Sequence, residues 1–85
     1  MKPSDKSAVH DFLVELLKQN RDQRPLADSA PIFTSGRLDS FSLMQTVVHL
    51  EETFGIDFSG GGFDMELLDS VDAIEALVDK KGRPG

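Results

Sequence analysis

Apolar side chains recur every three or four residues in three stretches of this chain, which predicts three amphipathic helices. The first stretch begins near a cap at Ser4 or Asp5 and ends near Asn20. Its apolar face comprises Val9, Phe12, Leu13, Leu16 and Leu17. One face of this helix should therefore be buried, while its other positions, which are mostly polar, face water.

The second stretch, residues 40–54, has two apolar rows where a surface helix needs one. We expect the first row to face the core; it consists of Leu43, Val47, Leu50 and Phe54. The second row, Phe41, Met44 and Val48, begins one residue after Ser40. This row could be buried against a further helix. An aromatic residue at an exposed helix start, together with an adaptable methionine, is more typical of a partner contact.

The remaining segments predict one small all-α domain with a long loop. Residues 21–39 contain Pro25, Pro31 and Gly36, and four apolar residues that should pin this loop to the core: Leu26, Ile32, Phe33 and Leu38. A break is expected at residues 59–62 and a short helix at 63–68. Asp69 or Ser70 then caps a last helix that ends at residues 80–82. We expect one domain over residues 1–85, with its core at about 4–81 and a flexible tail at 82–85.

The composition narrows the chemistry of this domain. The 85 residues contain no cysteine, so neither a disulfide nor a thiolate site can form. The N-terminal segment carries acids among its apolar residues and is typical of neither a signal peptide nor a membrane span. We therefore expect a cytoplasmic monomer without membrane insertion.

The charge is unevenly distributed. The net charge is -6, and residues 38–79 include ten acidic residues and no Lys or Arg. This field repels nucleic acid and attracts proteins that carry basic docking patches. A scattered acidic surface usually serves only solubility, but the complete lack of basic residues over half the chain favours a docking surface.

The candidate chemistry lies at Asp39 and Ser40, where the long loop meets the second helix. The first N–H groups of a helix lack partners within the helix and favour a nearby phosphate, so a phosphodiester on Ser40 would be stabilised there. The alternative is that Ser40 is a simple helix cap. A second Asp-Ser pair ends at Ser70, but too few residues follow for a comparable domain, so we interpret Ser70 as a cap. His10 and His49 are interpreted as surface residues, and we predict neither a catalytic residue nor a metal site.

Two segments together resemble the acyl carrier protein family. They are Leu38-Asp39-Ser40-Phe41 and, further along the second helix, the run from Leu50 to Phe58 that begins Leu-Glu-Glu-Thr-Phe. The resemblance covers most of the chain and implies a four-helix bundle with three longer helices, one short helix and a long loop between the first two.

The resemblance also implies a function. Ser40 would carry covalent 4′-phosphopantetheine, and Asp39 would help the phosphopantetheinyl transferase and its magnesium engage the site. Phe41, Met44, Val48, Glu51 and Glu52 match positions that the family presents to its partner enzymes. Such a protein is not an enzyme. It holds acyl groups as thioesters for fatty acid, polyketide or related biosynthesis.

Two departures from the family pattern affect the choice of pathway. Phe41 stands where Leu is commonest, and Ser42, Gln45 and Thr53 stand where fatty-acid carriers often have acids. These departures favour a dedicated set of partners over general fatty acid synthesis. Two alternatives remain: a carrier of aminoacyl or peptidyl groups loaded by an amino-acid-activating ligase, and an unmodified helical interaction module.

Overall fold

The computed structural model describes residues 1–56 and 65–81, and all its regular elements are helical. They are α1 (Pro3–Gln19), α2 (Ser40–Phe54), the one-turn 3-10 helix η1 (Met65–Leu68) and α3 (Val71–Lys81). The predicted all-α fold of three longer helices and one short helix is confirmed. The predicted break at 59–62, the first two residues of the short helix and the tail at 82–85 lie outside the described residues.

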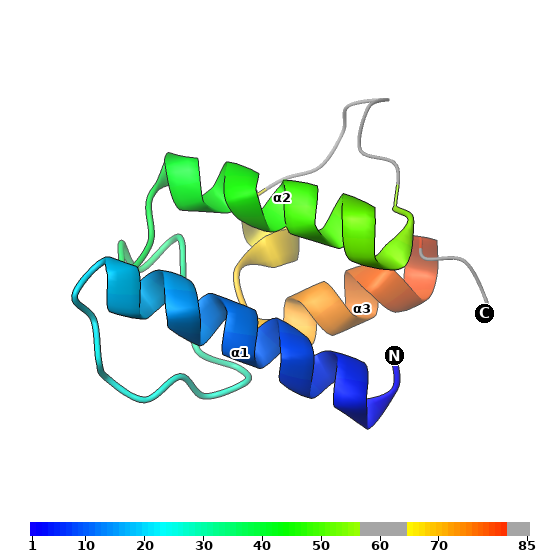
Figure 1. Cartoon of the computed structure of the whole chain (residues 1–85), viewed down its shortest axis with the longest axis horizontal. Helices are drawn as coiled ribbons and strands as arrows, with labels where there is room; N and C mark the ends of the chain where they lie inside the picture. The colour runs from blue at the N-terminus through cyan, green and yellow to red at the C-terminus, as the bar shows by residue number, and fades with distance from the viewer. Residues whose placement is uncertain (57–64, 82–85) are drawn as a thin grey trace.

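The helices form a small bundle around one core. In the view of Figure 1, α2 lies above α1 and α3, and η1 lies between α2 and α3. α1 ends and α2 begins at the same end of the molecule, while the N-terminus and the end of α3 lie toward the other end (Figure 1). The buried apolar side chains include Val9, Leu13, Leu16, Leu17, Leu43, Val47, Leu50, Leu68, Val71, Ile74, Leu77 and Val78.

The helix ends show which residues act as caps. α1 begins at Pro3, with Lys2 as a cap that makes no side-chain hydrogen bond, so the prediction of Ser4 or Asp5 was wrong. Proline suits the first helical position, because the N–H it lacks would have no partner within the helix there. At α3 the Ser70 hydroxyl accepts a hydrogen bond from the Ala73 N–H at 3.0 Å, which confirms that Ser70 is a cap.

The loop between α1 and α2 packs against the core as predicted. Its four apolar residues are all buried, with exposed fractions of 8% or less: Leu26, Ile32, Phe33 and Leu38. The sequence did not reveal the main polar anchor of this loop, the Asp69 carboxylate, which lies between η1 and α3. Oδ1 of Asp69 accepts hydrogen bonds from three successive backbone N–H groups, those of Ile32, Phe33 and Thr34, at 3.1, 2.7 and 2.9 Å.

Candidate functional site

Ser40 is the first residue of α2, and its side chain is not used to cap the helix. Asp39 is the cap: it has an extended backbone, and its carboxylate accepts the Ser42 N–H at 2.9 Å. This hydrogen bond holds the pKa of Asp39 below its usual value, so the cap is ionised at neutral pH. Ser40 is exposed, and its hydroxyl makes no hydrogen bond to any described residue. The simple-cap interpretation of Ser40 is therefore wrong.

The loop that leads into Ser40 is held by a nearly buried ion pair. Nε of Arg37 lies 2.8 Å from Oδ2 of Asp22, and only 10% of each side chain is exposed. The Arg37 guanidinium also donates to the carbonyls of Arg24 and Pro25. Arg24 and Arg37 together hold the pKa of Asp22 far below its usual range. Because Leu38 follows Arg37 into the core, this pair fixes the backbone three residues before Ser40.

The two apolar rows of α2 separate as predicted. Leu43, Val47 and Leu50 are buried, while Phe54 is only half-buried. Phe41, Met44 and Val48 are 71%, 53% and 46% exposed, respectively, and form a continuous surface beside Ser40. An exposed apolar surface of this kind is typical of an interaction site.

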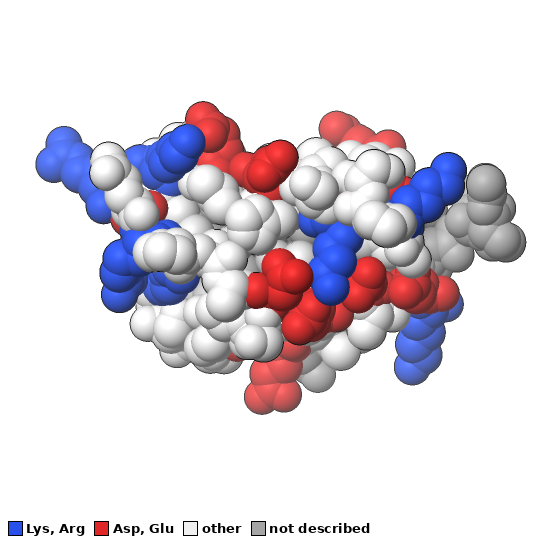
Figure 2. Space-filling view, turned by 90° about the horizontal axis from the view of Figure 1, so that it is seen from below, with Lys and Arg blue, Asp and Glu red and all other residues white. Residues whose placement is uncertain are grey.

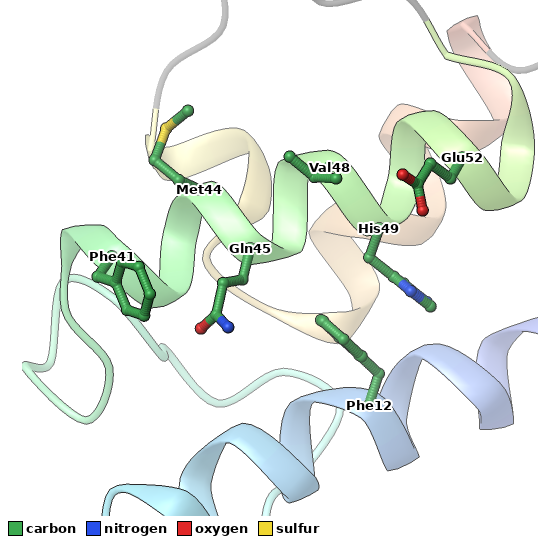
Figure 3. Close-up of a pocket in the computed structure, with 7 residues that line it drawn as sticks. All are labelled: Phe12, Phe41, Met44, Gln45, Val48, His49 and Glu52. Carbon is green, nitrogen blue, oxygen red and sulfur yellow. The ribbon is translucent and has the colours of Figure 1, made fainter.

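This surface continues into a groove between α1 and α2 of about 490 Å³. Figure 3 shows Gln45 and His49 pointing from α2 toward Phe12 of α1, with Phe41 at the end near Ser40. The rings of Phe12 and His49 stack in parallel, with their centroids 4.0 Å apart. Burial lowers the pKa of His49, and the charge of Glu52 offsets only part of this effect. The groove therefore has an uncharged floor at neutral pH.

Neither histidine is the simple surface residue that the sequence predicted. His49 supports the groove by stacking on Phe12, which itself is half-buried and not part of the innermost core. His10 is half-buried, and its Nε2 lies 2.8 Å from the carbonyl oxygen of Leu26 in the long loop. Both residues thus pack α1 against other segments. Their spacing in the sequence carries no periodic signal for these contacts.

Glu51 and Glu52 occupy the last turn of α2, as predicted. Glu52 is exposed at the edge of the groove, and Glu51 is half-buried. No group of three or more His, Asp and Glu side chains in residues 1–56 and 65–81 could hold a metal ion. No described helix has the length and apolar character needed to cross a bilayer.

These features suit the attachment of a phosphate-linked group. Ser40 presents an exposed hydroxyl at the start of a fifteen-residue helix, where the first N–H groups favour a negative charge. Asp39 satisfies one of these donors and lies on the loop side, and apolar side chains flank the helix start. The arrangement can hold a covalent phosphodiester, and it contains no assembled nucleophile, base and acid for catalysis among the described residues.

An all-helical domain with an exposed attachment point of this kind fits the class of carrier domains, which hold a group for other enzymes. The family model described as "Phosphopantetheine attachment site" matches residues 7–78, and the chain belongs to this family. It is a phosphopantetheine-binding carrier protein of the acyl carrier type, and its cofactor is covalently attached 4′-phosphopantetheine. No curated protein and no solved structure matches the chain.

Proposed function

We propose that Ser40 is the residue that carries 4′-phosphopantetheine, and that the holo-protein presents acyl thioesters to enzymes of fatty acid, polyketide or related biosynthesis. The observation that supports this most directly is the division of roles at the start of α2. Asp39 caps the helix, so the exposed Ser40 hydroxyl makes no hydrogen bond among the described residues. The chain has no cysteine, and the cofactor supplies the thiol on which the acyl group is held.

The residues of the chain then have distinct tasks. The first turn of α2 stabilises the negative charge of the phosphodiester. The loop, pinned by Arg37 and Asp22, keeps the attachment point at a fixed place on the surface. Because the arm is tethered, delivery of the acyl group depends on an effective concentration rather than on free diffusion.

Recognition by partner enzymes would use the exposed row of α2. We infer that Phe41, Met44 and Val48 contact the phosphopantetheinyl transferase, the loading ligase and the acyl-processing enzymes. Glu51 and Glu52 attract the basic docking patches of those enzymes, since rim charges accelerate encounter more than they strengthen the final complex. The lack of acids at Ser42, Gln45 and Thr53 supports a dedicated set of cytoplasmic partners.

Intact mass after incubation with coenzyme A, magnesium and a broad-specificity phosphopantetheinyl transferase tests the proposal. The parent protein should gain one phosphopantetheine, and Ser40→Ala should gain none. Ser70→Ala is the matched control, because it removes the serine of the second Asp-Ser pair and should still be modified. If well-folded parent protein gains no mass with several transferases, the chain is an unmodified interaction module and the proposal is wrong.

A further inference from the structure

Basic side chains collect at the end of the molecule that presents Ser40. Residues 18–24, together with Arg37, include four basic residues and a single acid, Asp22. Figure 2 shows one face of the molecule, with several Lys and Arg side chains at its left end, others near its middle and right end, and Asp and Glu mainly over the middle. The acidic surface expected from the sequence therefore does not extend over the whole molecule.

Contacts in the structure place these basic residues beside the attachment site. The Asn20 side-chain amide donates to the Arg37 carbonyl at 2.9 Å, so the end of α1 is joined to the segment that enters α2. Arg37 is three residues before Ser40, so their Cα atoms are at most about 11 Å apart. The basic groups near Arg37 thus lie in the region that a partner covers when it receives the arm.

Three of the basic side chains are directed to solvent. The side chains of Lys18 and Arg24 are 60% and 72% exposed, and Arg21 is exposed as well. Arg21 and Arg24 line a hollow of about 440 Å³ together with Asn20 and Gln23. Arg24 also contacts Asp22, at 2.8 Å, and Lys18 lies 3.9 Å from Glu15, but both side chains remain largely exposed. Arg37 differs from these three side chains, because it is only 10% exposed and also donates to two carbonyls. We call the surface formed by Lys18, Arg21 and Arg24 the basic end.

The opposite end of α2 has the opposite charge. Glu52 is twelve residues beyond Ser40, a distance of about 18 Å along the helix axis. The Debye length at physiological ionic strength is about 8 Å, so the two ends are separated by roughly two screening lengths. A partner therefore meets two distinct fields of opposite sign.

We propose that the basic end is a docking surface for an acidic patch on the partner enzyme, located beside the opening that receives the arm. The enzyme's basic groups would face Glu52 at the far end of α2. Opposite charges at two separated points admit one orientation of the carrier and disfavour the reversed one. The alignment with the arm rests on the proposed attachment at Ser40, whereas the basic end itself is independent of it.

The distribution of charge indicates that the basic end binds an acidic protein rather than a nucleic acid or a small anion. A nucleic acid long enough to bind with useful affinity would extend over the neighbouring acidic residues, which repel it. A small anion such as phosphate is best held by paired guanidinium groups, but Arg24 and Arg37 already share the Asp22 carboxylate. An acidic protein patch does not need paired guanidinium groups: it can contact the exposed Lys18 and Arg21, and the exposed part of Arg24, without covering the acids farther away.

The test uses the isotope-labelled full chain, in its holo form and with the charge changes Arg21→Gln and Arg24→Gln together. Lys2→Gln with Lys80→Gln is the matched control, since it removes the same charge from exposed residues at the other end. Each protein is titrated by NMR at low ionic strength with a glutamate-rich peptide, a single-stranded oligonucleotide of equal charge, and inorganic phosphate. Intact mass is recorded for every sample.

The glutamate-rich peptide should shift the amides of residues 18–24 and 37, and the Arg variant should bind it about three- to tenfold more weakly, the effect of losing two exposed ion pairs. The control variant should match the parent. The proposal is overturned if the peptide shifts do not concentrate at the basic end or are unchanged in the Arg variant. It is also overturned if the oligonucleotide binds more tightly there or if phosphate alone saturates the same amides. A missing mass gain would refute attachment at Ser40 and leave the peptide result to be judged separately.

Discussion

Replacing Asp69 with Asn should strongly destabilise the domain. Asp69 joins the start of α3 to the long loop, 35 to 37 residues earlier in the chain. One of its oxygens accepts three backbone N–H groups, and the other accepts the Thr34 hydroxyl at 2.5 Å. An amide presents only one acceptor oxygen and carries no charge, so it cannot reproduce this set.

The magnitude follows from these contacts. A hydrogen bond to a charged group contributes about 1.5–3 kcal/mol where its partners are shielded from water. Phe33 is buried, but Thr34 is exposed, and the Ile32 N–H keeps a second acceptor in the Asp69 carbonyl at 2.7 Å. The loss of roughly one of these bonds should therefore reduce stability by its full contribution, and the loss of the others by less. The expected decrease in the free energy of unfolding is about 2–4 kcal/mol. For a domain of this size the Tm should fall by about 10–25 °C.

The pH dependence provides a second readout. Burial raises the pKa of Asp69, but the hydrogen bonds from Thr34, Phe33 and Ile32 outweigh this effect, so the folded-state pKa lies below the usual value for an aspartate. A lowered folded-state pKa contributes stability that is present above the unfolded pKa and is lost as the pH falls through the folded value. Between neutral pH and about pH 3, the parent should therefore lose more stability than Asp69→Asn does.

Urea and thermal unfolding of the parent, Asp69→Asn and the control Glu66→Gln measure these effects. Glu66 is exposed and lies in η1, so its variant removes a nearby charge without removing this set of bonds. A Tm for Asp69→Asn within about 2 °C of the parent would mean that water replaces the carboxylate at little cost. The reasoning about the loop anchor would then be wrong.

Two further predictions concern the cap and the charge. Asp39→Ala should lower the free energy of unfolding by about 1 kcal/mol, or the Tm by about 4–8 °C, because the Ser42 N–H loses its acceptor. Asp39→Asn retains a capping oxygen, so its Tm in the same melting experiment should stay close to that of the parent. Added monovalent salt or millimolar magnesium should raise the Tm by a few degrees (about 2–6 °C), since screening weakens the repulsion among the ten acids of residues 38–79. A Tm that does not change with either additive would show that Lys6, which already contacts Asp28, Asp72 and Glu75, relieves most of this repulsion.

The sequence predicts those parts of the fold that depend on periodicity. The bounds of α2 and the division between its buried row and the exposed Phe41, Met44 and Val48 follow from the 3.6-residue repeat and are confirmed. The predicted start of α1 was wrong because Ser4 and Asp5 both suit a cap, and the sequence does not show which residue has the extended backbone of a cap. For the same reason, the pattern leaves open whether Asp39 or Ser40 caps α2.

The polar anchors of the loop could not be predicted. Arg37 contacts Asp22 across 15 positions, and Asp69 contacts residues 32–34 across more than thirty. Such pairs depend on how the helices pack, and a single sequence carries no periodic signal for them. The charged Arg37 directly before the buried Leu38 is the one local sign that a basic side chain is held near the core.

These anchors explain how so long a loop can serve a carrier. Twenty residues, 20–39, separate α1 from α2, and ordering them costs conformational entropy that burial offsets for only a few of them. Asp69 fixes the middle of the loop, and the pair of Arg37 with Asp22 fixes its end, so Ser40 lies on a rigid base. The exposed side chains of α2 take no part in either anchor. If the exposed row of α2 recognises the partners as proposed, recognition and stability depend on different residues, and the partner surface can change in evolution without loosening the proposed attachment site.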